Sequence, residues 1–89
     1  MTKNLATVEI AIRPNGSGPL VYGVYVTAGV VRVGDTVTAP SGETAHIDKL
    51  VLVQDGKRVE IDAATSGLRP VLEISPVVAL TDGDEVTFA

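Results

Sequence analysis

Residues 44–61 read TAHIDKLVLVQDGKRVEI, and this segment is the clearest indication of a β-sheet fold in the sequence. Apolar side chains alternate with polar ones until the alternation slips near Lys49, where a β-bulge would restore the facing. A period of two is typical of a strand with one buried face. Asp55 and Gly56 follow, and both tolerate the positive φ angles of a tight hairpin turn. Residues 57–61 are therefore predicted to return as the second strand of a hairpin.

The rest of the chain repeats this pattern of short strands and turns. Further strands are predicted at residues 8–13, 20–28, 36–39, 68–74 and 85–88. Residues 29–35 are predicted to form a turn, a short link and a second turn, and residues 63–67 form a connection of small residues. No window shows an amphipathic helix with start and stop signals. About seven or eight short strands, with turns about every 8–12 residues, predict an all-β fold. The architecture we expect is a small closed antiparallel barrel of about six to eight strands, with residues 1–89 as a single domain.

Two predicted strands show which side chains should face the core. In the first, Val8, Ile10 and Ile12 alternate with polar or small residues, so they are predicted to share one buried face. In the second, Tyr22 and Tyr25 have opposite parity, so at most one of them points inward. The other is a plausible contact residue, because tyrosine often anchors interfaces. Gly23, between the tyrosines, predicts a bulge or a close backbone approach. In the other predicted strands, the candidate core positions are Val37, Ile47, Ile74 and Val86.

Composition and charge make several classes of function and site improbable for this chain. The chain has 7 Lys and Arg residues against 11 Asp and Glu residues, which argues against broad, charge-driven binding of nucleic acid but leaves room for a small, specific RNA contact. It has no cysteine, which excludes a disulfide or a thiolate metal site. No apolar run is long enough to cross a membrane. Only three aromatic residues are present, which leaves little surface for stacking on bases or sugars.

Residues that could carry chemistry are few. His46 is the only histidine, so a zinc site with three or four ligands is not expected. Asp82 and Asp84 flank Gly83, which is typical of a turn and falls short of a calcium loop. Residues 16–18 read Gly-Ser-Gly without the helix that a phosphate cradle needs. The sequence therefore predicts no enzyme, no catalytic residue, no metal site and no cofactor.

Several segments together resemble one known family. Residues 8–12 read VEIAI, residues 16–18 read GSG, residues 20–24 read LVYGV, residues 29–37 read GVVRVGDTV, and residues 80–86 read LTDGDEV. In this order they resemble the second domain of translational GTPases such as elongation factor Tu, and residues 29–37 are the most specific part. A weaker match runs from Val59 to Leu72.

The resemblance implies a β-barrel that accompanies a GTP-binding domain and contacts the aminoacyl end of transfer RNA or the ribosome. Glu9 stands where the family's transfer RNA carriers have a first acidic residue. Ile10 and Ile12 stand where those carriers have a second acidic residue and an aromatic one. The chain has no Walker A sequence, so GTP hydrolysis by this chain alone is excluded.

The expected function is that of a non-catalytic binding module, a free-standing translation-factor-type barrel that docks on a protein or ribonucleoprotein partner. The alternative is a structural subunit of a larger assembly, such as a decoration or cement protein of a phage capsid or tail; a sugar-binding or small-ligand barrel is disfavoured by the scarcity of aromatic residues. Binding is expected to use a loop and its neighbourhood, because a rigid scaffold presents functional loops. The candidate binding residues are Glu9, Arg13, Asn15, Gly16, Ser17, Gly18 and Tyr25. The expected location is the cytoplasm, or the virion for a phage protein, without a membrane partner.

Overall fold

The computed structural model describes residues 4–12, 21–76 and 78–89. All regular elements in these residues are β-strands. They are β1 (Asn4–Ile12), β2 (Val21–Ala28), β3 (Val30–Arg32), β4 (Thr36–Thr38), β5 (Thr44–Gln54), β6 (Lys57–Ile61), β7 (Ala63–Thr65), β8 (Val71–Ser75) and β9 (Glu85–Phe88). None of the described residues forms a helix that is long and apolar enough to cross a membrane.

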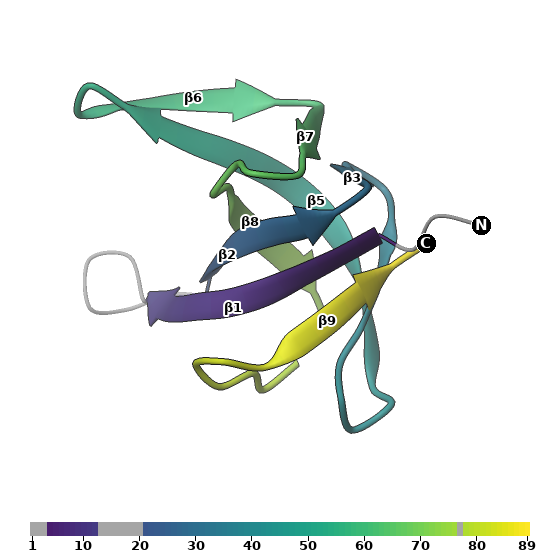
Figure 1. The fold of residues 1–89 in the computed structure, drawn as a ribbon. Helices are drawn as coiled ribbons and strands as arrows, with labels where there is room; N and C mark the ends of the chain where they lie inside the picture. The colour runs from purple at the N-terminus through teal and green to yellow at the C-terminus, as the bar shows by residue number, and fades with distance from the viewer. Residues whose placement is uncertain (1–3, 13–20, 77) are drawn as a thin grey trace.

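Six of these strands close into an antiparallel barrel. The sheet runs β4-β9-β1-β2-β8-β5-β6, and an additional pairing of β4 with β5 closes the ring and leaves β6 outside it. Figure 1 shows β6 and the adjoining end of β5 extending beyond the barrel as a hairpin. The predicted all-β class and the closed barrel are confirmed.

The interior of the barrel is filled by β-branched and aliphatic side chains from every wall. The four candidate core residues, Val37, Ile47, Ile74 and Val86, are all buried. No polar or charged residue other than Tyr22 is buried among the described residues. The Tyr22 hydroxyl donates a hydrogen bond to the carbonyl oxygen of Val78 (2.8 Å) and accepts one from the backbone N–H of Leu80 (3.3 Å). Both polar capacities of this buried hydroxyl are therefore used.

The long hairpin forms as the sequence predicts. The register of β5 against β8 shifts between Ile47 and Lys49, which places a bulge at the predicted slip. Asp55 and Gly56 have φ angles of 52° and 75°, and Gln54 pairs with Lys57 across them. These are the features of a two-residue type I′ turn.

The first strand differs from the prediction. The register of β1 against β2 shifts between Val8 and Ile10, so Glu9 and Ile10 together oppose Gly23. Val8 is buried, but Ile10 and Ile12 are exposed. The expected shared buried face of Val8, Ile10 and Ile12 is wrong, because the extra residue of a bulge turns the strand after it to the other face.

A second difference concerns the predicted linkers. Residues 30–32 and 63–65, expected as a link and a connection, pair as β3 and β7 in a separate two-stranded sheet. Three residues on each side are too few to show a period in the sequence. Strand β8 begins at Val71, directly after the buried Pro70, as expected for a proline that cannot donate to a central ladder.

Candidate interaction surface

The outer wall of the barrel carries a group of charged, aromatic and aliphatic side chains where β1 bulges. The backbone of residues 68–70 continues β8 along β2, because Val24 and Val26 donate to the carbonyl oxygens of Pro70 and Leu68 (both 3.0 Å). This register sets Arg69 opposite Tyr25 on the outside of the barrel.

Arg69 contacts both Tyr25 on β2 and Glu9 at the bulge of β1. Its guanidinium carbon lies 4.7 Å from the centroid of the Tyr25 ring, within the range of a cation–π contact. Its Nε lies 3.3 Å from Oε1 of Glu9. Arg69 and Glu9 are 66% and 42% exposed, so water reaches both charges, and the pair contributes little to stability. The two contacts place a charged side chain and an aromatic side chain next to each other on the outer wall.

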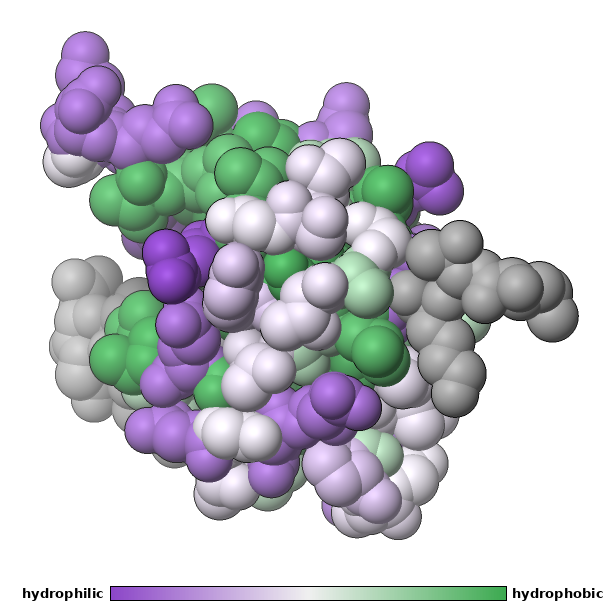
Figure 2. Space-filling view, viewed as in Figure 1, coloured by the Kyte–Doolittle hydropathy of each residue, from purple (hydrophilic) through white to green (hydrophobic). Residues whose placement is uncertain are grey.

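Ile10 extends this surface with an apolar side chain. It is 51% exposed and lies over Gly23, where a Cβ atom would approach the Ile10 Cγ2 to 2.8 Å. Figure 2 shows hydrophobic side chains at this end of β1 and again over the β5–β6 hairpin. We call Glu9, Ile10, Tyr25 and Arg69 the bulge cluster.

Two of the residues predicted for binding meet in this cluster. Glu9 and Tyr25 are brought together by Arg69, which the sequence shows only as one of several scattered basic residues. The remaining candidates, Arg13, Asn15, Gly16, Ser17 and Gly18, lie outside the described residues. The parity prediction for the tyrosines is confirmed, because Tyr22 is buried and Tyr25 is half-buried.

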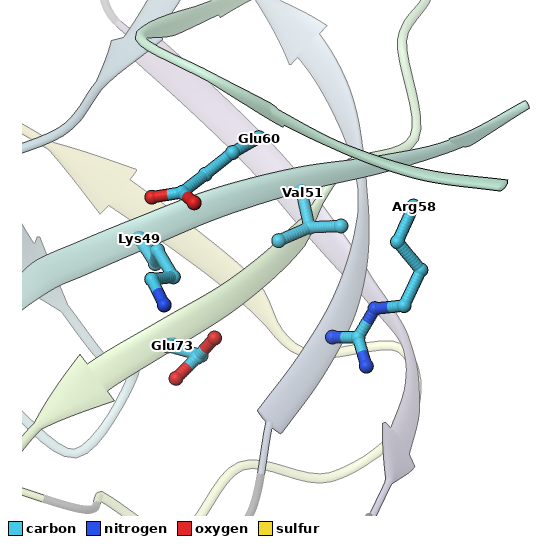
Figure 3. A pocket seen from close by; sticks show the side chains of 5 residues that line it. All are labelled: Lys49, Val51, Arg58, Glu60 and Glu73. Carbon is cyan, nitrogen blue, oxygen red and sulfur yellow. The ribbon is translucent and has the colours of Figure 1, made fainter.

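A second surface feature lies on the outside of β8, β5 and β6. Lys49, Val51, Arg58, Glu60 and Glu73 line a shallow hollow of about 310 Å³. In Figure 3, Lys49 extends toward Glu73, its cross-strand partner, and Arg58 lies on the other side of Val51. Charges of both signs surround a valine here, so the hollow shows no preference for an anion or a cation.

Metal ligands do not converge in the part of the chain that the structure describes. No three or more His, Cys, Asp or Glu side chains there gather as a metal site would require. His46 is exposed on β5, between Thr36 and Ser75 of the neighbouring strands.

Two acidic residues close turns of the same construction. Asp35 Oδ2 accepts the N–H of Arg32 (2.8 Å), and Asp84 Oδ2 accepts the N–H of Thr81 (2.9 Å). The backbone N–H of Asp35 also donates to the carbonyl oxygen of Arg32 (3.1 Å), and the backbone N–H of Asp84 donates to the carbonyl oxygen of Thr81 (3.0 Å). Gly34 and Gly83 precede them with φ angles of 93° and 88°, where glycine is strongly favoured.

Solved structures of translation factors contain a domain with the same architecture. GDP-bound aIF5B from Aeropyrum pernix matches 98% of the chain with a TM-score of 0.79 and 13% sequence identity. The translation elongation factor SelB from Methanococcus maripaludis, in its apo form, matches 96% with a TM-score of 0.75 and 20% identity. The chain has the fold of the translation-factor β-barrel. No protein-family model and no curated protein matches its sequence.

In both of these translation factors, the barrel is a small part of a much longer chain. The chain spans 16% of the aIF5B chain and 18% of the SelB chain. The resemblance in fold is confirmed over nearly the whole chain. Its most specific motif, residues 29–37, contains one of the two Gly-Asp turns, and residues 80–86 contain the other. The Gly-Asp residues of these two motifs therefore form turns of the barrel, and the match there carries information on fold.

Proposed function

We propose that the chain is a non-catalytic binding module, a translation-factor-type barrel that docks on a protein or ribonucleoprotein partner through the bulge cluster. The observation that carries the proposal is the arrangement of Glu9, Arg69 and Tyr25 beside the exposed Ile10. Aromatic residues and arginine are enriched in protein interfaces, and such residues supply much of the binding energy. An arginine held by an ion pair and a ring loses less side-chain entropy on binding than a free one.

The chemistry of the cluster favours a protein or the protein part of a ribonucleoprotein. The chain carries a formal net charge of −4, and a carboxylate already pairs with the cluster's arginine. Binding to bare RNA through phosphates would require unpaired basic residues on this wall. A partner that offers an apolar side chain for Ile10 and an acceptor for Arg69 fits the surface better.

The test is affinity capture of the tagged chain from lysate of its source, with and without nuclease. The cluster variant Tyr25→Ala/Arg69→Ala is compared with Lys57→Ala, an exposed change on the hairpin. We expect the wild type and Lys57→Ala to retain the same partner, and the cluster variant to lose it. Retention by the cluster variant, or no partner at all with the wild type, would overturn the proposal. Nuclease sensitivity distinguishes a ribonucleoprotein from a protein alone.

One observation favours the alternative, a structural subunit of an assembly such as a phage capsid or tail. Strand β6 pairs only with β5 among the described strands, so one of its edges is open. An open strand edge is a surface on which another chain can add. A subunit of this kind would be recovered in particles or with an abundant shell protein. Substitution of Tyr25 or Arg69 would not weaken its binding to that shell protein.

A further inference from the structure

Strand β6 ends the seven-stranded sheet with an edge whose hydrogen-bonding groups can be identified. Gln54 and Lys57 flank the two-residue turn, and such a flanking pair exchanges both of its backbone hydrogen bonds. The pattern alternates along an antiparallel ladder, so Val59 and Ile61 also bond to β5. The N–H and C=O groups of Arg58 and Glu60 therefore point to the open edge.

The open stretch is short and has a defined end. The carbonyl oxygen of Asp62 accepts the N–H of Val33 at 3.0 Å, so the edge is occupied from that residue onward. Residues 57–60 are exposed. Val59 is 44% exposed, so an apolar side chain remains uncovered beside the free backbone groups.

We propose that β6 pairs antiparallel with β6 of a second copy of this chain, about a two-fold axis at Val59. In this register Arg58 lies opposite Glu60 of the second copy, and Glu60 lies opposite its Arg58. Each such pair exchanges two backbone hydrogen bonds, because both residues have their free groups on the open edge. The strand Lys-Arg-Val-Glu-Ile is thus complementary to itself when reversed.

The charges select this register over the other two-fold arrangements. An axis at Arg58 would place the two copies of Arg58 directly opposite each other, and an axis at Glu60 would do the same with two carboxylates. Like charges directly opposite in a sheet are destabilising, and opposite charges stabilise. The axis at Glu60 would also need the backbone of Asp62, which already bonds to Val33.

The same register covers the exposed Val59. Val59 meets its own copy as a non-hydrogen-bonded pair, in which side chains lie closest. Leu52, which pairs with Val59 in the hairpin, extends this apolar row on each side. On the opposite face, Arg58 and Glu60 of the two copies form an alternating square of charges. The bulge cluster on β1 and β2 takes no part, so this inference stands independently of the proposed partner.

Charge reversal tests the register directly. The oligomeric state is measured by sedimentation equilibrium over a concentration series to about 1 mM, a range that detects weak dimers. We expect a wild-type dimer, and for Arg58→Glu and Glu60→Arg alone a rise in the dissociation constant of about tenfold or more, which corresponds to about 1.4 kcal/mol. Lys57→Glu is the matched control, because Lys57 would face the uncharged Ile61 and its dimer should persist.

Complementation separates a specific register from a general loss of charge or fold. An equimolar mixture of Arg58→Glu and Glu60→Arg pairs opposite charges at both positions, so the mixture should form a heterodimer. The double variant Arg58→Glu/Glu60→Arg should regain the homodimer. A wild type that stays monomeric throughout, or a dimer that the single variants leave unchanged, would overturn the proposal.

Amide hydrogen exchange gives a second readout that does not require a variant. The amides of Arg58 and Glu60 should become protected as the protein concentration rises, while the amide of Val59 is protected already in the monomer. Protection that is independent of concentration at Arg58 and Glu60 would contradict the pairing.

Discussion

Strands β1 and β5 both contain a bulge, but only the bulge of β5 keeps the apolar side chains on both sides of it in the core. In β5 the bulge falls between Ile47 and Lys49, and two polar residues in succession there interrupt the alternation. The apolar residues on both sides of it, Ile47 and Leu50, are buried. In this strand the sequence changes phase together with the backbone, and the bulge preserves the core.

In β1 the backbone changes phase while the sequence does not. Val8, Ile10 and Ile12 keep a regular alternation through the bulge at Glu9, so the two isoleucines emerge on the outer wall. A bulge without a matching phase change in the sequence therefore exposes apolar side chains. Such a site lies next to Glu9, Tyr25 and Arg69, which is why we assign the interaction surface to this wall.

The largest expected effect on stability is the difference between isoleucine-to-alanine substitutions in β5 and in β1. Ile47→Ala should lower the free energy of unfolding by about 2–5 kcal/mol, because it leaves a cavity in the core. Ile10→Ala should cost less than about 1 kcal/mol, because half of that side chain is already in water. Chemical denaturation of both variants measures the difference. Equal costs would show that Ile10 is in the core, contrary to its exposed position after the bulge.

The next effect tests how closely β1 and β2 pack at the bulge. Gly23→Ala places a Cβ atom 2.8 Å from Cγ2 of Ile10, and such overpacking typically costs about 1–3 kcal/mol. In an Ile10→Ala background the clashing atom is absent, so the same change should be close to neutral. A double-mutant cycle gives the coupling. Additive costs would place the cause of any destabilisation elsewhere.

A smaller effect distinguishes the two tyrosines of β2. Tyr22→Phe should cost about 1–2 kcal/mol, because it leaves the buried carbonyl of Val78 and N–H of Leu80 without their partner. Tyr25→Phe should leave the unfolding free energy unchanged within about 0.5 kcal/mol. Thermal and urea unfolding measure both. The inward and outward assignments of β2 would be in error if the order were reversed.

The smallest expected effect on stability is that of Arg69 in the bulge cluster. Arg69→Ala should change the free energy of unfolding by less than about 1 kcal/mol, because its ion pair with Glu9 is exposed. The variant should nevertheless lose the captured partner. A large loss of stability would mean that Arg69 supports the fold, and partner loss could then no longer be attributed to the surface.

The longer strands, the turn at Asp55 and Gly56, the bulge of β5 and four buried core residues could be predicted from the sequence. These features are local: a period of two, or a residue type that tolerates a particular φ angle, is visible within a few neighbours. The Gly-Asp turns belong to the same class, because each joins residues three apart in the chain.

The remaining features depend on contacts between segments that are distant in the chain. The bulge of β1 is set by its pairing with β2, and β3 and β7 form because residues about 30 apart meet as a short ladder. Glu9, Tyr25 and Arg69 are distant in the chain and become neighbours through the sheet order of β1, β2 and β8. A surface built from three strands depends on register, and register results from packing one strand against another, which no single segment of sequence contains.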